Sequence, residues 1–579
     1  MDDKFVTEAQ IVYETAHSNP DKVRFMLPDD RGNWRAITWG AFYDKAQAIS
    51  AYVSSIALDG GDKVAVFLKN MVEWAYISNA IHVYRAVFVP IYISSTAEQS
   101  KYVINHSDAK LLFTEMDKLD TILTILDDLP NLKHIIITDL ENDAKLIEKV
   151  ETYALSKRID KKNALSRFIS LSKVYDIGNE INIKRPHLYK TMIDKITLSD
   201  VSSLLYTSGT TGNPKGVVLT INNLYTNAKD WIDVLSPLIP ETRIDLLWLP
   251  LSHIFGWGEL GLGNTLGFTT YMTTHIDVLR VMPEVMPTIF ISVPAYWEKL
   301  YLDAVASSNT KSSQLEKLRQ LTGGALKFCL SGGAGLKKQV KDFFYDAGLL
   351  IIEGYGLTEC SPTLTMNKKD DFNFDSVGKP FPNVSLKLDL DGEILAKGPN
   401  VFSQYYKDPL STKEAFTDDG WFKTGDIGQF NNKGFLKIIG RKKEIIVTSG
   451  GKNISPQLIE SKFKDDPYIE QAVLYGNERK YIVALIIVKE NAIRNYAASI
   501  GIDKEQSLDD LLKTNEIISL IQQRIDNVNS ELASFETIKK FYLYPSPLTI
   551  EGGFLTPSFK LKRNKVYDAF KEQLDSLYD

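Results

Sequence analysis

The sequence predicts an α/β protein with a large N-terminal domain and a small α+β C-terminal domain. Over the first 115 residues, short apolar runs alternate with helical patterns, which is typical of βαβ units and parallel sheets. From Val201 to about Gly440 the chain is rich in Gly, Pro and short apolar strands, which predicts a further part rich in β-structure. The texture changes after Arg441, so we assign residues 1–440 and 441–579 to separate domains.

The expected elements follow from local patterns. Strands are expected at 62–68, 86–93 and 110–113, with a helix at 73–84 between the first two. Residues 139–194 are more charged and have little apolar rhythm apart from a helix at 144–155, so we expect a surface excursion there. In the C-terminal part, strands are expected at 472–475 and 482–488, with helical patterns between them.

Composition limits the partners and the compartment. Lys and Arg number 67 against 73 Asp and Glu, a net charge of −6, which argues against nucleic acid as the main partner. Only Cys329 and Cys360 occur, so there is no disulfide framework, and we expect a reducing, cytoplasmic location. The first residues do not resemble a secretory signal, and no apolar run reaches the length of a membrane span. Peripheral membrane contact and a homodimer stay open.

The strongest local signal is the segment Tyr206-Thr-Ser-Gly-Thr-Thr-Gly-Asn-Pro-Lys-Gly216, which follows an apolar strand at 201–205. Its glycines let backbone amides approach an anion, and its hydroxyls and Lys215 can bind phosphate oxygens. A P-loop is excluded because Gly209 and Gly212 are three apart and Pro214 precedes the lysine. The segment therefore predicts a different kind of polyphosphate-binding loop.

Six further segments follow this loop, at 249–253, 331–335, 355–359, 424–426, 440–443 and 554–563. With these segments in this order, the chain resembles the AMP-forming adenylating enzymes (the ANL superfamily), and among them the long-chain fatty acyl-CoA synthetases. The resemblance implies two half-reactions: a carboxylate attacks the α-phosphate of ATP to give acyl-AMP and pyrophosphate, and a thiol then displaces AMP. It also implies that the C-terminal domain is mobile and rotates between the two steps.

The resemblance implies roles for the nucleotide site. Tyr355 would stack on adenine, Thr358 would bind the α-phosphate, and Asp426 would accept hydrogen bonds from the ribose, with Arg441 close by. Glu359 and Thr207 would supply protein oxygens to Mg²⁺, a hard cation that suits this donor set. The full ATP/AMP-binding set is Thr207, Ser208, Gly209, Thr210, Thr211, Gly212, Lys215, Gly332, Gly333, Ala334, Glu353, Gly354, Tyr355, Gly356, Thr358, Asp426, Arg441 and Lys443.

The resemblance also implies the acyl and thiol sites. His253, which we expect at a strand end, would lie at the carboxylate end of the acyl pocket with Ile254, and Trp257 would gate the tunnel. Lys443 would be the hinge, and Lys560 would be the catalytic lysine of adenylation, with Lys562 as its alternative. The path of the pantetheine arm of CoA would pass Ser449, Gly450 and Gly451. Thr358, Glu359, His253 and Lys560 are thus the expected catalytic residues.

The predicted substrates are a fatty acid, ATP and CoA. The Lys443 hinge, Trp257 and the Thr-Pro-Ser-Phe-Lys tail favour a long-chain acid by resemblance. Three alternatives remain: an aromatic or short acid, a carrier-protein thiol in place of CoA, and a silent module that binds nucleotide or acyl groups without catalysis. Occupied catalytic positions argue against the silent module.

Overall fold

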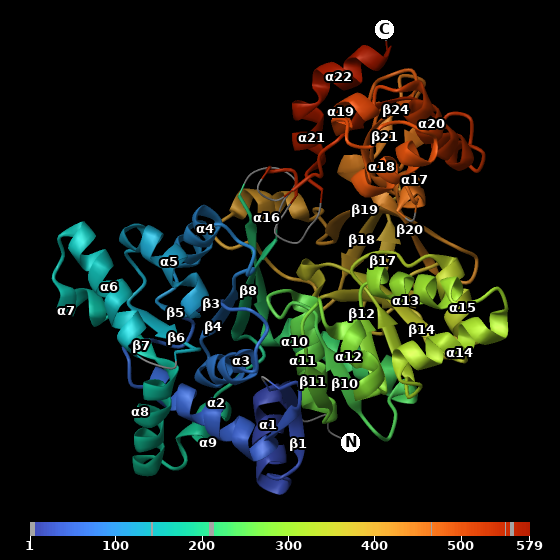
Figure 1. Cartoon of the computed structure of the whole chain (residues 1–579). Helices are drawn as coiled ribbons and strands as arrows, with labels where there is room; N and C mark the ends of the chain where they lie inside the picture. Colours follow the sequence, from blue (N-terminus) through green and yellow to red (C-terminus); the bar gives the residue numbers. More distant parts are fainter. Residues whose placement is uncertain are drawn as a thin grey trace.

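Two large β-sheets, a four-stranded sheet and a smaller domain make up the structure (Figure 1). The computed structural model describes residues 6–29, 31–140, 143–207, 213–464, 466–549, 552–555 and 561–578. This arrangement confirms the predicted fold class, a large N-terminal α/β domain with parallel sheets followed by a smaller domain. No helix among the described residues is both long and apolar enough to cross a membrane.

The first large sheet has seven strands and is parallel apart from one edge. Its last two strands, β8 and β9, form an antiparallel hairpin that frames the predicted phosphate loop. The buried apolar faces of its central strands explain why the sequence shows them as short continuous apolar runs. In spatial order the strands are β7 (Phe168–Ser170), β6 (His134–Ile137), β5 (Leu111–Thr114), β3 (Lys63–Phe67), β4 (Val87–Pro90), β8 (Val201–Thr207) and β9 (Lys215–Thr220).

The second large sheet has nine strands with a parallel centre and antiparallel edges. It carries the carboxyl ends of β13 and β14 toward the nucleotide segments predicted from the sequence. In spatial order the strands are β16 (Lys379–Pro380), β15 (Thr363–Met366), β14 (Ile351–Gly356), β13 (Phe328–Ser331), β12 (Ile289–Ser292), β10 (Ile244–Leu247), β11 (Thr269–Met272), β1 (Val23–Pro28) and β2 (Trp34–Thr38).

Helices cover both large sheets (Figure 1). Several begin at a side-chain cap, as α4 does at Thr96, whose capping box with Gln99 satisfies the first backbone amides. The helices of this part are α1 (Glu8–Ser18), α2 (Trp39–Val53), α3 (Glu73–Tyr84), α4 (Ala97–Ser107), α5 (Met116–Ile125), α6 (Asp143–Lys157), α7 (Lys161–Leu165), α8 (Leu171–Lys184), α9 (Leu188–Ile193), α10 (Ile221–Leu235), α11 (Ile254–Leu266), α12 (Val278–Val285), α13 (Pro294–Ala306), α14 (Lys311–Thr322), α15 (Lys338–Asp346) and α16 (Pro409–Ala415), with short 3₁₀ helices η1 (Leu126–Asp128), η2 (Ser236–Leu238) and η3 (Thr358–Cys360).

The segment 139–194 differs from our expectation of a surface excursion. It adds β7 to the edge of the seven-stranded sheet and packs α8 against α2. The packing is close, because a Cβ on Gly178 would lie 2.0 Å from the carbonyl oxygen of Ala48. The buried residues of α8 are Leu171, Val174 and Gly178, and its other face is charged. The sequence of this segment therefore gives little indication of the contact.

Beyond the large sheets, an antiparallel sheet of four strands leads to the small domain. It comprises β17 (Ser385–Leu388), β18 (Glu393–Lys397), β19 (Phe422–Phe430) and β20 (Leu436–Arg441). The 3₁₀ helix η4 (Lys442–Glu444) then connects β20 to the strand β21 (Ile446–Val447), which pairs with β22 (Asn453–Ile454). Of the predicted nucleotide residues, Arg441 therefore ends β20 immediately before this connection, and Lys443 lies within it.

The small domain has a mixed three-stranded sheet and α-helices of four to fifteen residues, as an α+β domain should. Strand β24 is buried along its whole length, and the apolar side chains on its two faces belong to separate clusters. Its elements are β23 (Ile469–Tyr475), β24 (Ile482–Val488), β25 (Ile538–Tyr544), α17 (Pro456–Glu460), η5 (Ser461–Phe463), α18 (Glu490–Ser499), α19 (Leu508–Leu511), α20 (Asn515–Asn529), α21 (Arg563–Ala569), α22 (Lys571–Asp575) and η6 (Ser576–Tyr578).

Candidate active site

The ends of the predicted phosphate loop are fixed by the β8–β9 hairpin. Thr207 and Lys215 lie opposite each other in its register. The Lys215 ammonium lies 5.0 Å from the ring centre of Tyr405, so an aromatic face and a cation flank the same end of the hairpin. The predicted residues Ser208, Gly209, Thr210, Thr211 and Gly212 lie outside the described residues.

Tyr405 also links this hairpin to Glu359. Its hydroxyl donates a hydrogen bond to Oε1 of Glu359 at 3.0 Å, while the Glu359 carbonyl accepts from the amide of Phe402. Burial and the adjacent Glu359 raise the pKa of Tyr405, so its hydroxyl stays protonated and acts as a donor. A carboxylate and the Thr207 hydroxyl are oxygen donors of the kind that Mg²⁺ takes, so this end of the site fits that ion chemically.

Tyr355, Asp426 and Arg441 form a second cluster. The Tyr355 hydroxyl donates to Oδ2 of Asp426 at 2.6 Å, and Nε of Arg441 lies 2.8 Å from Oδ1 of the same carboxylate. Asp426 lies within β19, and Gly425 beside it has φ +73°. Burial, followed by the Asp426 charge, raises the pKa of Tyr355 well above its ordinary value. The three predicted nucleotide residues are therefore held together by the protein itself.

Tyr355 lies on β14, and the residue that follows it, Gly356, must be glycine. A Cβ on Gly356 would lie 1.8 Å from the carbonyl oxygen of Pro362, a distance that no side chain tolerates. The chain then turns into η3, which presents Thr358 and Glu359 and packs against β9. The close approach at Gly356 thus brings the predicted α-phosphate residue beside the hairpin that carries Lys215.

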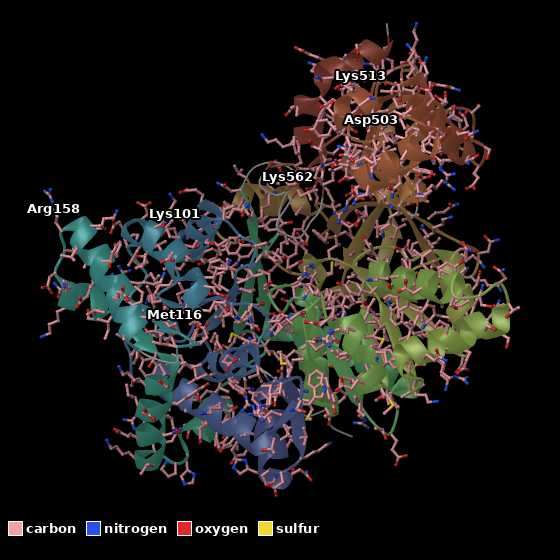
Figure 2. The ribbon with its side chains drawn as sticks, viewed as in Figure 1. Lys101, Met116, Arg158, Asp503, Lys513 and Lys562 are labelled. Atoms are coloured by element: carbon pink, nitrogen blue, oxygen red, sulfur yellow. The ribbon has the colours of Figure 1, made fainter. Side chains whose placement is uncertain are left out.

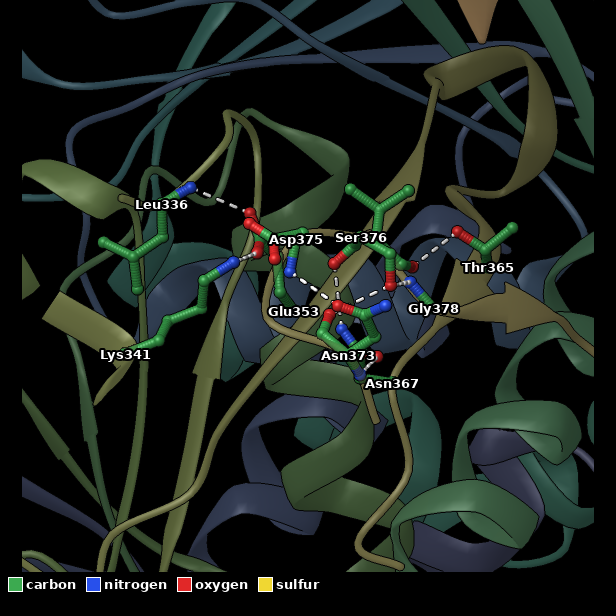
Figure 3. A network of polar contacts seen from close by, with 10 residues as sticks. Leu336, Lys341, Glu353, Thr365, Asn367, Asn373, Asp375, Ser376 and Gly378 are labelled. Atoms are coloured by element: carbon green, nitrogen blue, oxygen red, sulfur yellow. Dashed lines mark hydrogen bonds and ion pairs between the residues drawn. The ribbon is translucent and has the colours of Figure 1, made fainter. Parts of the chain in front are cut away.

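Glu353 is bound by the protein rather than exposed to a ligand (Figure 3). Its carboxylate accepts a 2.8 Å hydrogen bond from the amide of Leu336 and pairs with the Lys341 ammonium. The two charged side chains are only 3% and 4% exposed. Although burial raises the pKa of Glu353, the Lys341 charge opposes that shift. Glu353 therefore fastens the loop that contains Gly332, Gly333 and Ala334 to β14, the strand of Gly354.

That loop also touches the acyl side of the site. A Cβ on Gly332 would lie 2.9 Å from the Phe255 ring, so the absence of a side chain lets the ring lie against the loop. Phe255 is on α11, directly after Ile254, which is buried. The loop of the predicted nucleotide residues 332–334 and the helix that carries the predicted acyl-side residues Ile254 and Trp257 are therefore in contact.

His253 lies at the start of α11, six residues after β10 ends, and not at a strand end as we expected. Its Nδ1 accepts the amide hydrogen of Phe255 at 3.1 Å, so the imidazole caps the helix. Asn70 fixes the segment before it, since its side chain binds the carbonyl of Leu249 and the amide of Leu251. The histidine is thereby held between the two large sheets.

Trp257 is buried, with 8% of its surface exposed, and packs against the seven-stranded sheet. Its ring centre lies 5.2 Å from that of Phe88 and 5.6 Å from that of His82. His82 in turn shares a 2.9 Å hydrogen bond with Ser202 on β8, and burial lowers its pKa to about 4, so the ring is neutral at physiological pH. Trp257 thus spans the interface between the sheets.

Predicted residues of the small domain lie apart from these clusters. Lys443 is exposed in η4, and Ser449, Gly450 and Gly451 form an exposed turn between β21 and β22, with φ +72° at Gly451. Lys560 lies outside the described residues. Three residues later, Arg563 binds both oxygens of Glu460 at 2.7 and 2.8 Å, which anchors the end of the predicted catalytic tail.

Two protein families together match most of the sequence. The model of a family described as AMP-binding enzyme matches residues 12–406, and that of the AMP-binding enzyme C-terminal domain matches residues 443–579. Long-chain-fatty-acid–CoA ligase FadD15 of Mycobacterium bovis is 32% identical over 99% of this chain and 97% of its own length. Long chain acyl-CoA synthetase 6, peroxisomal, of Arabidopsis thaliana is 29% identical over 94% of this chain and 82% of its own length.

Solved structures share the fold at lower identity. The A domain of carboxylic acid reductase from Segniliparus rugosus, in complex with AMP and a carboxylic acid, superposes with a TM-score of 0.77 at 20% identity, over 100% of this chain and 95% of the other. The o-succinylbenzoate coenzyme A synthetase of Bacillus subtilis, in complex with ATP and magnesium, gives 0.66 at 20% identity, over 96% and 98% of the two chains.

Proposed function

The chain belongs to the AMP-binding enzyme family, and on that premise we propose that it activates a long-chain fatty acid with ATP and transfers the acyl group to CoA. The observation that carries this proposal is the likeness to FadD15, which spans 99% of the chain and 97% of a relative named as a long-chain-fatty-acid–CoA ligase. AMP and pyrophosphate would be the other products.

In the first half-reaction, two anions must meet. Lys215 and the hydroxyl of Thr207 would bind phosphate oxygens at the end of the hairpin, and Thr358 would bind the α-phosphate. Mg²⁺, held by Glu359 and Thr207, would neutralise phosphate charge. Tyr405 would keep the Glu359 carboxylate in place through its 3.0 Å hydrogen bond.

The nucleoside would be held by the second cluster. Tyr355 would lie on adenine, and Asp426 would accept hydrogen bonds from the ribose hydroxyls. Because Tyr355 and Arg441 already fix the Asp426 carboxylate, little ordering remains to be done when the nucleotide binds. Glu353 would act indirectly, by holding the loop of Gly332 and Gly333 against the strand of Gly354.

The acid would enter on the α11 side. His253 would face its carboxylate, and Trp257 would close the apolar passage, since its large amphipathic side chain packs against Phe88 of the first sheet. We place the domain boundary between residues 440 and 441 and the hinge at Lys443, which is also where the match to the C-terminal family model begins. Rotation at this hinge would move Lys560 away from the active site and bring the turn at 449–451, the proposed path of CoA, to it.

The test is AMP release with ATP, Mg²⁺ and a series of saturated fatty acids, with and without CoA. We expect CoA-dependent release that is greatest with a long chain. Acid-dependent pyrophosphate exchange without CoA turnover would instead indicate a carrier-protein thiol as acceptor, and activity only with aromatic or short acids would refute the long-chain assignment. Absence of exchange with every acid would indicate a silent binding module.

A further inference from the structure

A buried carboxylate on β18 joins the ribose segment, residues 424–426 of β19, to the proposed hinge. Glu393, whose side chain is 5% exposed, accepts the amide hydrogen of Gly425 on Oε1 at 2.9 Å. Its other oxygen, Oε2, accepts from the ammonium of Lys442 at 2.6 Å. One side chain therefore contacts two segments that are seventeen positions apart in the sequence.

The first contact fixes the backbone that presents Asp426. Gly425 has φ +73°, and its amide points at Glu393 rather than continuing the strand ladder. Thr424, on the other side, donates its hydroxyl hydrogen to the carbonyl of Ile394, next to Glu393 on β18. Two neighbouring residues of β18 thus hold the segment whose next residue is the proposed ribose ligand.

The second contact holds the residue that precedes the hinge. Lys442 lies directly before Lys443, and its ammonium also binds Oδ2 of Asp391 at 2.5 Å. The two carboxylates raise the pKa of Lys442, so the ammonium stays charged. Carboxylate oxygens of Asp389, Asp391 and Glu393 lie within 4.8 Å of one another, and the Lys442 ammonium is the cation that binds two of them.

We propose that Glu393 and Lys442 form a clamp that confines domain rotation to Lys443 and couples it to the ribose segment. With Lys442 fastened to β18, the small domain pivots after that residue, while Arg441 stays paired with Asp426. Without the clamp, residues 441–442 would join the flexible hinge, and the small domain would sample orientations that suit neither half-reaction. The inference rests on the proposed two-step function, since it specifies how that function's hinge is located.

A purely structural role is the competing explanation, because a lysine with two carboxylates at a strand end can simply stabilise a sheet. The chain offers a matched control. Lys387 lies on β17, at the opposite edge of the four-stranded sheet from β20, is 43% exposed against 42% for Lys442, and pairs with Asp419 at 3.2 Å. Lys387→Met and Lys442→Met each remove one ammonium of similar exposure, but only the second removes the clamp, and only the second leaves a buried carboxylate, that of Glu393, without its cation.

The experiment measures domain orientation and chemistry in the full chain. Dyes on Glu316→Cys and Lys513→Cys would report the separation of the two domains by single-molecule energy transfer. Selective labelling is feasible because Cys329 and Cys360 are both buried. Three further measurements accompany it. Pyrophosphate exchange measures adenylation, turnover of preformed acyl-AMP measures thioester formation, and calorimetry measures AMP affinity.

For Lys442→Met we expect a broader energy-transfer distribution and a decrease of about five-fold or more in both half-reactions, with AMP affinity within about two-fold of wild type. Glu393→Gln should show the same broadening together with weaker AMP binding, since a neutral amide oxygen is a poorer acceptor for the Gly425 amide. Lys387→Met should match wild type throughout.

The clamp is refuted if Lys442→Met gives the same distribution and rates as Lys387→Met. Failure of the proposed function would look different. Unsubstituted protein would then show no acid-dependent pyrophosphate exchange, while AMP binding and the energy-transfer distributions of the two lysine variants would still decide whether the clamp controls orientation.

Discussion

The Tyr355 hydroxyl and the Asp426 carboxylate lie 2.6 Å apart, and their hydrogen bond joins the nine-stranded sheet to the four-stranded sheet. Both residues belong to the nucleotide site that we propose. Their contact therefore orients the base-side aromatic ring and the ribose-side carboxylate relative to each other before any ligand binds, while Arg441 holds the other carboxylate oxygen.

Tyr355→Phe should weaken ATP binding while the ring remains. A hydrogen bond to a charged group contributes roughly 1.5–3 kcal/mol, so we expect the KM for ATP to rise by about ten-fold or more. The KM for the fatty acid should change little, because the acid side of the site is untouched. Tyr345→Phe, on an exposed tyrosine of α15, is the control. An equal rise in both KM values would argue against a nucleotide-specific role.

Lys341→Met should lower the free energy of unfolding by more than the loss of a single ion pair on the surface would. It leaves the Glu353 carboxylate buried without its cation, which typically costs about 3–5 kcal/mol. Adding Glu353→Gln should recover most of that loss, since the charge is then removed. Chemical denaturation of the single and double variants tests this. The control is Lys338→Met, because Lys338 lies on the same helix and pairs with Asp342 at the surface. This substitution should lower the free energy of unfolding by less than about 1 kcal/mol.

A buried acid pair, Asp245 on β10 and Glu259 on α11, should make stability depend on pH. Burial raises the pKa of Asp245 to about 6, and burial together with the neighbouring Asp245 raises that of Glu259 well above its ordinary value. The folded state therefore retains protons that the unfolded chain releases from about pH 4 upward. Hence the free energy of unfolding falls as pH rises through the folded-state pKa values.

Glu259→Gln removes one of these titrating groups. We expect its free energy of unfolding, relative to that of wild type, to be higher at pH 8 than at pH 5, by roughly 1.4 kcal/mol for each ten-fold difference in proton affinity between the folded and unfolded states. Chemical denaturation at the two pH values measures this. Glu316→Gln, at an exposed site, should show no such pH-dependent difference. A constant difference between Glu259→Gln and wild type across this range would show that the pair does not retain the proton.

Lys560→Ala should abolish adenylation but spare thioester formation from preformed acyl-AMP. The reason is that a lysine bridging the acid carboxylate and the α-phosphate has no role once the acyl-phosphate bond exists. Lys562→Ala is the control, and Lys562 lies near the junction of the small and large domains (Figure 2). Loss of adenylation in Lys562→Ala instead would transfer the role to that residue. Equal loss of both half-reactions in folded Lys560→Ala would contradict use of the lysine in a single step.

Trp257→Ala should reduce selectivity for chain length. Its ring fills the interface beside Phe88 and His82, so truncation should also lower stability by about 3–5 kcal/mol. We expect the ratio of kcat/KM between a long and a short saturated acid to fall by at least about three-fold. Trp421→Ala, on a tryptophan that contacts Lys387 on the four-stranded sheet, should leave that ratio unchanged. An unchanged ratio in Trp257→Ala would refute the gate.

Local patterns predicted the regular elements well. The helix Glu73–Tyr84 and the strand Ile482–Val488 have the bounds expected from their apolar runs, and the 62–68 prediction contains β3. These elements are buried along most of their length, so their pattern is strong. At 139–194 the expected helix at 144–155 lies within α6, but the surface excursion was wrong, because β7 has only three residues and α8 buries a narrow face beneath a charged surface.

Long-range contacts were not predictable in the same way. The sequence marked Tyr355, Asp426 and Arg441 by resemblance, but nothing in it indicated that Tyr405, which is outside every recognised segment, would link Lys215 to Glu359. Likewise, Arg441 and Lys442 belong to one basic run in the sequence. In the structure their side chains bind different carboxylates, and only the fold determines which.

The burial of both cysteines has a chemical consequence for the proposed reaction. Acyl-AMP is an electrophile that a thiolate attacks, and Cys360 directly follows Glu359. Burial raises the pKa of Cys329 to about 12 and that of Cys360 well above its ordinary value, so both remain protonated. Neither buried sulfur is then a nucleophile toward the activated acid, which would be left for the external thiol.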